Sequence, residues 1–223
     1  MLPIYDGSGD IVLSPSNDKF LLSEERYKKR VAVFDNINKV LTQVIPGLTI
    51  NLKEISKDLT KDGEMGHVVR FMACRNGKET PICFESDGVR RIISMLALIV
   101  LAYNNPSVTL VIDEFDAGIY EYLIGEILQS FEESGKGQLI FTSHNLRPLE
   151  LINKKFIVFT TTNPDNRYYR FKGLTSTSNL RDSYLREIII GEQDEELYTE
   201  TRMFEIESAM RKAGKESNED AEN

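Results

Sequence analysis

The sequence is poor in the residues that cross-link small secreted domains or form common metal sites. Its 223 residues include two cysteines, two histidines and no tryptophan. Cys74 and Cys83 lack the spacing of a metal site, and we interpret them as reduced thiols in a cytoplasmic protein. The N-terminus has no basic segment followed by an apolar core, so no secretory signal is visible.

Long hydrophobic runs and excess positive charge are also missing. The longest apolar run, from Ile92 to Tyr103, is about a dozen residues, which is too short to span a bilayer. We therefore expect no membrane contact. The net charge of -8 and the pI near 5.0 argue against a dominant nucleic-acid surface, although local basic patches are compatible with them. With 41% hydrophobic and 28% charged residues, the composition is typical of a soluble globular domain.

The pattern along the chain predicts four segments. They are a leader loop or isolated strand (1–22), a helix followed by a β-meander (23–84), an alternation of strands and helices (85–211) and a disordered tail (212–223). In the second segment a helix starts after Ser23 and stops at Pro46-Gly47. The expected strands are 49–55, 67–75 and 81–84, with a hairpin turn at Asn76-Gly77.

The third segment predicts the main body of the fold. A buried helix is expected from residue 85, and strands are expected at 108–112, 138–143 and 155–160, with 167–171 as a hairpin arm. Strands that alternate with helices are typical of a parallel sheet. The expected class is α/β, with a mainly parallel sheet and flanking helices, preceded by a helix and a small antiparallel β region.

Adjacent carboxylates end the first of these strands, in VTLVIDEFDAGIY (108–120). Ligands of open α/β sheets bind at the carboxyl ends of the strands, where Asp113 and Glu114 lie. Neighbouring strand residues point opposite ways, so the two carboxylates need different tasks unless the backbone turns. One can reach Mg²⁺, directly or through water, and the other can orient or deprotonate an attacking water. The alternative is that acidic residues stand here only because the chain meets solvent.

Two further motifs carry polar groups to this region. His144 ends the next strand, where an imidazole can contact a γ-phosphate or the attacking water, or can cap the following helix. In ESDGVRR (85–91), Ser86 can cap a helix whose N-terminus is an anion site, and Gly88 permits close backbone approach. Arg90 and its neighbour lie at the wrong end of the helix dipole, so we expect them to face an anion or a partner. The alternative is a plain cap with two surface arginines.

In this order, the motifs resemble the C-terminal half of an ABC-type ATPase head with a P-loop NTPase-like fold. The resemblance covers residues 23 to about 172. It is to AAA-family ATPases of the overcoming-lysogenisation-defect and abortive-infection type, and more remotely to DNA-repair and chromosome-maintenance ATPases. The matching segments are a divergent signature motif (86–91), Walker B (108–114), the D-loop (116–120) and the switch-histidine segment (142–145).

The resemblance implies a role for each residue, with ATP and Mg²⁺ as cofactors. Asp113 would coordinate Mg²⁺, Glu114 would polarise the hydrolytic water, and His144 would sense the γ-phosphate. Ser86, Gly88 and Arg90 would face a nucleotide held mainly by another subunit. Asp116 would transmit across that interface. Catalysis between two heads implies a homodimer or heterodimer.

The phosphate-binding P-loop, G-x-x-x-x-G-K-[ST], is absent from the sequence. The nearest candidates are 7–10, 134–138 and 213–217, and none follows a strand and opens a helix. We therefore expect the chain to be a later part of a longer protein or the product of a split gene, inactive alone. Its partner would be the N-terminal P-loop lobe or a partner subunit, and DNA or an effector could join through the parent protein.

Two other functions fit the residues less well. A non-catalytic subunit could use 86–91 as a docking face for a partner ATPase. A metal-dependent nuclease could use Asp113, Glu114 and Asp116, although three acids within such a short stretch are cramped. The biological role, whether phage defence, DNA repair or another, stays open at this point.

Overall fold

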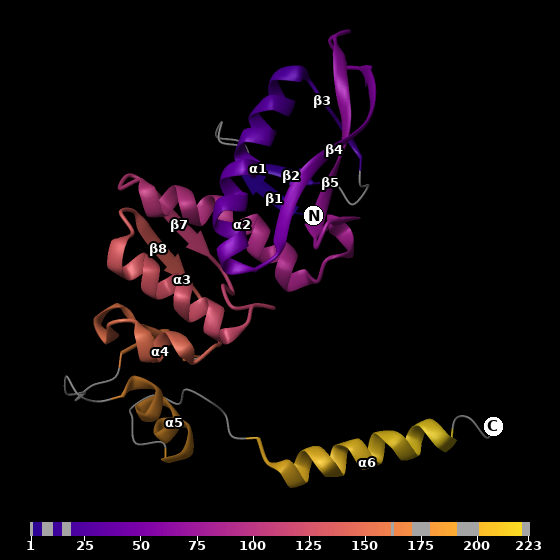
Figure 1. The fold of residues 1–223 in the computed structure, drawn as a ribbon. Helices are drawn as coiled ribbons and strands as arrows, with labels where there is room; N and C mark the ends of the chain where they lie inside the picture. The colour runs from indigo at the N-terminus through magenta and orange to yellow at the C-terminus, as the bar shows by residue number, and fades with distance from the viewer. Residues whose placement is uncertain are drawn as a thin grey trace. The chain divides into compact units, whose positions relative to one another are not determined.

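A computed structural model describes residues 2–5, 11–14, 19–161, 163–170, 179–190 and 201–219. The chain divides into two units, Met1–Leu151 and Ile152–Asn223, each with its own internal contacts. Figure 1 shows the order of the helices and strands. Both units contain helices and strands, so the fold is α/β, as the sequence predicts.

Helix α1 (Glu24–Val44) and an antiparallel sheet build the first part of unit one. The Ser23 hydroxyl caps the helix by accepting from the N–H of Arg26, and the helix ends just before Pro46. The sheet contains β3 (Phe20–Leu22), β4 (Leu48–Leu59), β5 (Met65–Arg75) and β6 (Lys78–Pro81). Strand β5 is central and pairs with the other three. The core between helix and sheet contains Phe34, Ile37, Leu41, Leu48, Ile50, Val69 and Phe71.

The turn between β5 and β6 corrects one predicted strand. Asn76 and Gly77 have φ values of 50° and 76°, as a two-residue hairpin turn requires, so pairing resumes at once with Lys78 opposite Arg75. The ladder ends at Pro81, which has no N–H to donate. The predicted strand 81–84 is therefore wrong: β6 covers Lys78–Pro81, and a single 3₁₀ turn, Ile82–Phe84, follows it.

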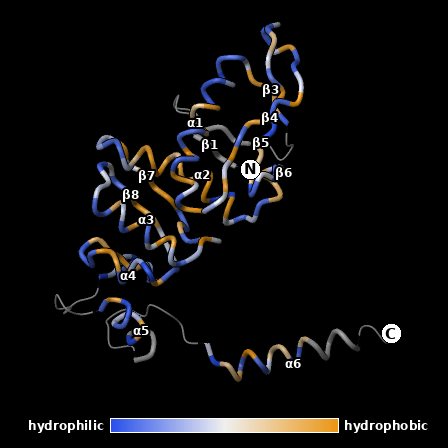
Figure 2. The backbone as a smooth tube through the Cα atoms, viewed as in Figure 1, coloured by the Kyte–Doolittle hydropathy of each residue, from blue (hydrophilic) through white to orange (hydrophobic). Residues whose placement is uncertain are grey.

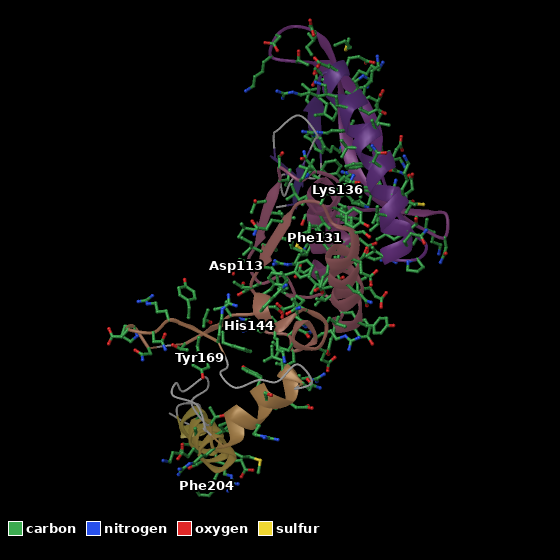
Figure 3. The ribbon with its side chains drawn as sticks, turned by 90° about the vertical axis from the view of Figure 1, so that its left-hand side faces the viewer. Asp113, Phe131, Lys136, His144, Tyr169 and Phe204 are labelled. Carbon is green, nitrogen blue, oxygen red and sulfur yellow. The ribbon has the colours of Figure 1, made fainter. Side chains whose placement is uncertain are left out.

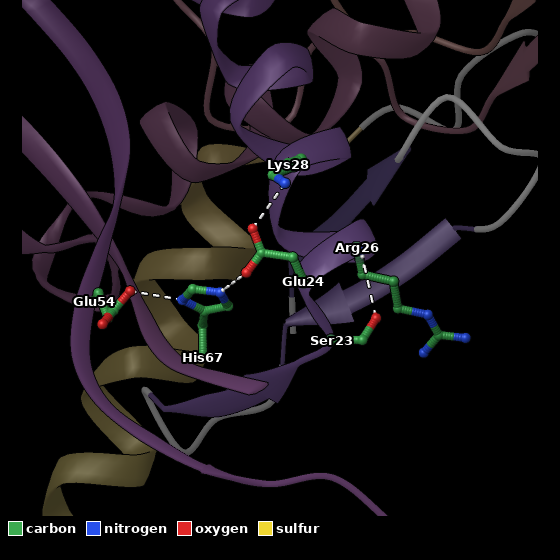
Figure 4. Close-up of polar contacts among 6 residues, drawn as sticks. All are labelled: Ser23, Glu24, Arg26, Lys28, Glu54 and His67. Carbon is green, nitrogen blue, oxygen red and sulfur yellow. Dashed lines mark hydrogen bonds and ion pairs between the residues drawn. The ribbon is translucent and has the colours of Figure 1, made fainter. Parts of the chain in front are cut away.

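His67 joins three elements of this region (Figure 4). Its Nε2 contacts the Glu24 carboxylate at the start of α1 at 2.5 Å, and its Nδ1 contacts Glu54 on β4 at 2.6 Å. The ring is 6% exposed and stacks on Tyr27, with centroids 4.3 Å apart. The hydrogen bond to Glu24, and then that to Glu54, raise the pKa of His67 above its ordinary value. The bond to His67 lowers the pKa of Glu24 to about 2.

The free edge of β4 is partly covered by a side chain of α1. The Asn38 amide donates to the carbonyl of Ile50 and accepts from its N–H, both at 2.8 Å. It takes the place of a neighbouring strand at that residue. Further along, a register shift between Glu54 and Ser56 interrupts the pairing of β4 with β5. Such irregularities protect an exposed strand edge against pairing with another chain.

The second part of unit one contains α2 (Asp87–Asn104), β7 (Thr109–Ile112), α3 (Glu121–Ser134), β8 (Gln138–Phe141) and α4 (Arg147–Leu151). Hydrophobic residues run along α2 (Figure 2), and most of its middle is buried. Strands β7 and β8 are parallel neighbours, with Ile112 opposite Phe141. Their covered face leads to a core that includes Ile112, Phe115, Ile124 and Leu128.

The other face of this parallel pair is not covered by the described residues of unit one. Val111 is 68% exposed and Ile140 is 47% exposed, and the two residues lie opposite each other. The sequence predicts strands covered on both faces, so this expectation is not met within the described residues. Parallel sheets are normally covered on both sides, because their strands are apolar on both faces. The described residues of unit one leave one such face uncovered.

The predicted mainly parallel sheet is found only in part. Among the described strands only β7 and β8 are parallel, and the largest sheet is antiparallel. The predicted strand 155–160 shrinks to β9 (Phe159–Thr160), which pairs antiparallel with β10 (Tyr168–Tyr169) in unit two. The intervening loop closes on itself through the Thr161 N–H and the Arg167 carbonyl at 3.0 Å. A local hairpin thus supplies the partner, and β10, which lies within the predicted arm 167–171, pairs as expected of that arm.

The chain ends differ from the predicted leader and tail. Strands β1 (Leu2–Tyr5) and β2 (Ile11–Ser14) form an antiparallel pair, and β1 lies against α2. Unit two contains helices α5 (Leu180–Ile190) and α6 (Met203–Glu219). Because α6 continues through Lys212, Ala213 and Lys215, which favour helix, the predicted disordered tail overlaps it; residues 220–223 lie outside the described residues. No helix among the described residues is long and apolar enough to cross a membrane.

Candidate functional site

The parallel pair brings two sets of polar residues to one end of unit one. Asp113 and Glu114 follow β7, and Thr142 to His144 follow β8. Asp113 and His144 are labelled in Figure 3. Backbone hydrogen bonds continue past the strands, from Phe115 N–H to the Thr142 carbonyl at 2.9 Å and from Thr142 N–H to the Ile112 carbonyl at 3.1 Å. Asp113, Glu114 and His144 are all exposed. The sequence predicts this convergence, because carboxyl ends of parallel strands meet at one edge.

The backbone turns at the second carboxylate. Glu114 has φ of 49°, in the left-handed region, which costs a residue with a side chain about 1–2 kcal/mol. Its carbonyl accepts from the N–H of Ala117 at 3.0 Å, which closes the turn. The next side chain, Phe115, is completely buried and packs against Phe141 with ring centroids 5.4 Å apart. The turn therefore leaves both carboxylates outside while Phe115 anchors the loop in the core.

Thr142 connects the two carboxylate residues. Its hydroxyl oxygen lies 2.8 Å from the N–H of Glu114 and also bonds the Asp113 carboxylate. An ionised carboxylate only accepts, so the hydroxyl donates to Asp113 and accepts from Glu114. Thr142 thereby fixes one carboxylate oxygen of Asp113 and leaves the other without a bond from this hydroxyl.

Arg91 reaches the same turn from the first turns of α2. Its Nη2 donates to the Asp113 carbonyl at 2.8 Å and to the Glu114 carbonyl at 2.6 Å. The sequence suggests an anion or a partner as the target of the two arginines. The structure instead directs Arg91 to backbone carbonyls, while Arg90 pairs with Asp87 one turn away on the same helix.

Asp116 ties the loop after β7 to the segment after β8. Both of its carboxylate oxygens accept from the backbone N–H of His144, at 3.2 and 3.3 Å. The backbone of His144 is therefore held by the loop that carries the two carboxylates, while its imidazole stays exposed. The structure brings Asp113, Glu114, Asp116 and His144 together in one connected loop pair.

Gly88 contacts the same loop by backbone packing. A Cβ atom at Gly88 would lie 1.9 Å from the carbonyl oxygen of Gly118, which itself has φ of 72°. Ser86 caps α2 by accepting from the N–H of Val89 at 3.3 Å, and its side chain is exposed. Close packing against Gly118 therefore explains why residue 88 is a glycine. This explanation stands beside the close approach of a ligand that the sequence suggests.

The donors at this end suit a hard cation only in part. Asp113 and the neighbouring hydroxyl offer oxygen ligands, which Mg²⁺ prefers, and Mg²⁺ often keeps several waters and takes one or two carboxylates. No group of three or more His, Cys, Asp or Glu side chains able to hold a metal ion occurs among the described residues. The residues therefore fit a Mg²⁺ held mainly by water and phosphate oxygens, with Asp113 as the protein ligand.

Sequence reasoning missed two contributors to this geometry. Thr142 lies in a segment singled out for its histidine, and Arg91 next to a residue singled out for anion contact. The signal that could have found Thr142 is its register: it follows Ile140 by two residues, on the strand face that ends in Asp113. No local pattern predicts that Arg91 turns toward two carbonyls more than twenty residues away.

Comparison with known proteins gives three results. No curated protein matches the sequence. Among solved structures, a chain from a study of ATP-driven dimerization and DNA-stimulated activation of SMC ATPases is 17% identical, with a TM-score of 0.48 over 73% of this chain and 93% of that one. The Smc head domain of Pyrococcus yayanosii, with its coiled coil and joint, is 13% identical, with a TM-score of 0.46 over 73% of this chain and 30% of that one.

A protein-family model gives the third result. The model described as "AAA domain, putative AbiEii toxin, Type IV TA system" matches residues 5–150. The match covers most of the chain and nearly all of unit one, including the carboxylates, the glycine contact and His144. On this match, the chain belongs to that AAA domain family.

Proposed function

We propose that this chain is the Walker B half of an ABC-type ATPase, which hydrolyses ATP only together with a P-loop lobe. The observation that carries the proposal is the open face of the parallel pair. Thr109, Val111 and Asp113 alternate along one face of β7, and Gln138, Ile140 and Thr142 along β8. The bare apolar patch therefore leads directly to the Asp113 carboxylate. A lobe that covered the patch would lie beside the carboxylate that needs a phosphate.

Each residue of the loop pair has a proposed role. Asp113 holds Mg²⁺, which neutralises phosphate charge when bound, and Glu114 orients or deprotonates the water. His144 faces the γ-phosphate. Ser86, Gly88 and Arg90 face the nucleotide of a second head, and Asp116 lies at that interface while holding the His144 backbone. ATP, Mg²⁺ and a head dimer are part of the proposal, as is any DNA or effector bound by the parent protein.

The arrangement favours this function over the two alternatives. A docking-only subunit needs an exposed surface but has no need for a strained Glu114 held by two other residues. A nuclease built on Asp113, Glu114 and Asp116 gains no support, because no suitable metal-binding group occurs in the part of the chain that is described. Asp116 is also engaged with the N–H of His144.

The test is to assay the chain alone and then with the polypeptide that supplies the P-loop, sought upstream of Met1 and in neighbouring genes. The chain alone should show no ATP hydrolysis. The reassembled protein should hydrolyse ATP with Mg²⁺, and Glu114→Gln should lower kcat roughly 100-fold or more, the range for loss of a general base. Glu114→Asp, which keeps a carboxylate on a shorter stem, is the matched control.

Two outcomes would contradict the proposal. One is ATP hydrolysis by the 223-residue chain alone that Glu114→Gln abolishes, which would place the whole site in this chain. The other is a reassembled ATPase whose kcat is unchanged by Glu114→Gln, which would show that another residue is the base. Manganese-dependent DNA cleavage by the chain would favour the nuclease alternative instead.

A further inference from the structure

The two contacts that hold Glu114 come from different elements. Arg91 belongs to the N-terminal half of α2, and Thr142 follows β8. In an extended strand, successive carbonyls point to opposite sides, so one side chain cannot reach both. Here the carbonyls of Asp113 and Glu114 both accept from Nη2 of Arg91, because the backbone at Glu114 is left-handed. Arg91 thus binds a conformation of the backbone rather than a side chain.

Thr142 fixes the same residue from the other side. Its single hydroxyl accepts from the N–H of Glu114 while it donates to the carboxylate of Asp113. A hydroxyl has one donor and spare acceptor capacity, so it can serve both groups at once. A valine has the same shape and can serve neither. The N–H and the carbonyl of Glu114 are therefore each held by a long-range side-chain contact.

These contacts matter little for the hydrophobic core. The neighbouring core residues Ile92, Ile93 and Phe115 are buried by apolar contacts that neither bond supplies. What the bonds determine is the orientation of the peptide units on either side of Glu114. If either bond is lost, the left-handed turn is less favoured, and a return to extended geometry would move the Glu114 side chain toward the opposite face from Asp113.

We infer that Arg91 and Thr142 are positioning residues that hold the Glu114 backbone in its left-handed turn, so that its carboxylate serves the same site as Asp113. This inference rests on the proposed function. It adds two residues that touch no reacting atom: Arg91 acts through Glu114, and Thr142 acts through Glu114 and through its bond to Asp113. It also gives α2, the helix of the signature-like segment, a direct mechanical contact with the proposed base.

The first experiment needs no ATPase activity. Amide hydrogen exchange at Glu114 is measured by NMR in the full chain and in Thr142→Val and Thr142→Ser. We expect Thr142→Val to speed exchange at this amide by about fivefold, the value of one lost hydrogen bond, and Thr142→Ser to leave it near wild type. Equal exchange in all three proteins would overturn the inference, whatever the fate of the ATPase proposal.

The second experiment uses the reassembled ATPase. We expect Thr142→Val and Arg91→Gln each to lower kcat by up to about 100-fold with little change in the KM for ATP, as expected for a misplaced catalytic group. Thr142→Ser should retain activity, and Arg91→Lys, which keeps a donor, should fall between. In a Glu114→Gln background Arg91→Gln should not lower kcat further, because it acts through Glu114, whereas Thr142→Val should retain a smaller effect through its bond to Asp113.

The outcomes separate the two proposals. A reassembled enzyme that is active but indifferent to Thr142→Val and Arg91→Gln would overturn the positioning roles and leave the proposed function intact. Full additivity of Arg91→Gln with Glu114→Gln would do the same for Arg91, since it would indicate an effect on the fold or on ATP binding. A reassembled wild type without hydrolysis would overturn the proposed function and the positioning roles with it.

Discussion

The two halves of unit one treat their polar groups in opposite ways. In the antiparallel region, made of α1 and β3 to β5, the buried His67 has a carboxylate on each ring nitrogen, and Asn38 covers a strand edge. In the parallel region, made of α2, β7, α3 and β8, three ionisable side chains stand exposed beside a bare apolar patch. In the first region these polar groups have their partners within unit one. The second region has the exposed apolar and ionisable groups that we expect of a surface that binds another lobe or subunit.

The difference teaches where to look for function. In the antiparallel region, the partners of His67 and Asn38 lie within unit one, so these contacts explain the fold. The polar groups after β7 and β8 are held in place by Arg91, Thr142 and Asp116, yet their free ends point to solvent. Hydrogen bonds that fix the orientation of exposed side chains are not explained by folding alone.

The largest expected effect is on the contact between Gly88 and Gly118. Gly88→Ala would place a Cβ atom 1.9 Å from a backbone carbonyl, so α2 or the loop after β7 must shift. We expect a loss of about 3 kcal/mol in the free energy of unfolding, measured by chemical denaturation. Gly63→Ala is the control: Gly63 has φ of 79° and nothing within 4 Å, so only backbone strain of about 1 kcal/mol is expected. Equal losses would contradict the close packing at Gly88.

A matched substitution tests the comparison itself. Ile50→Thr in the antiparallel region alters a side chain that is 1% exposed, and we expect it to cost about 2 kcal/mol in the chain alone. Ile140→Thr alters the open face and should cost no more than about 0.5 kcal/mol. In the reassembled protein, Ile140→Thr should weaken association instead. A comparable loss of stability from both changes in the isolated chain would mean that the face is covered there.

The smallest expected effect is a dependence of stability on pH through His67. Its pKa is raised above 6.5, so its contribution is fully present below pH 6.5 and is lost as the pH rises through the raised value. Glu24 has a pKa of about 2 in place of 4.5, so its contribution is present above pH 4.5 and is lost as the pH falls toward 2. We therefore expect the contacts of His67 with Glu24 and Glu54 to stabilise the chain most between pH 4.5 and pH 6.5.

His67→Gln measures this directly. The stability difference between wild type and His67→Gln should be largest below pH 6.5 and should shrink as the pH rises from 6.5 through the raised pKa of His67. Glu54→Gln should lower the pKa of His67, followed by NMR, because it removes one of the two carboxylates that raise it. A difference that is the same across this pH range would show that His67 contributes only by packing.

Local signals predicted most of unit one. Ser23 and Pro46-Gly47 set the ends of α1, Asn76-Gly77 set a hairpin, and the continuous apolar runs set β7 and β8. The errors arose where the partner of a segment decides its structure. The run at 155–160 reads like a third parallel strand, but a partner that follows within a few residues takes it into a hairpin.

The candidate site divides in the same way. Its carboxylates and histidine were predicted, because strand-end positions are visible in a periodic sequence. The residues that orient them were not, because the contacts of Arg91 and Thr142 join residues 22 to 29 positions apart. The bare face of Val111 and Ile140 was also missed, since a continuous apolar run carries no sign of what covers it.

The connection between β7 and β8 has a consequence for the time course of folding. Strands β4 and β5 join through a short turn that Gly63 closes, so their pairing forms from near neighbours. Strands β7 and β8 can pair only after α3 has crossed between them, which costs more chain entropy before any contact is gained. We therefore expect the hairpin to form early in refolding and the carboxylate turn to form late. The turn that carries Asp113 and Glu114 would then be the last part of unit one to fold.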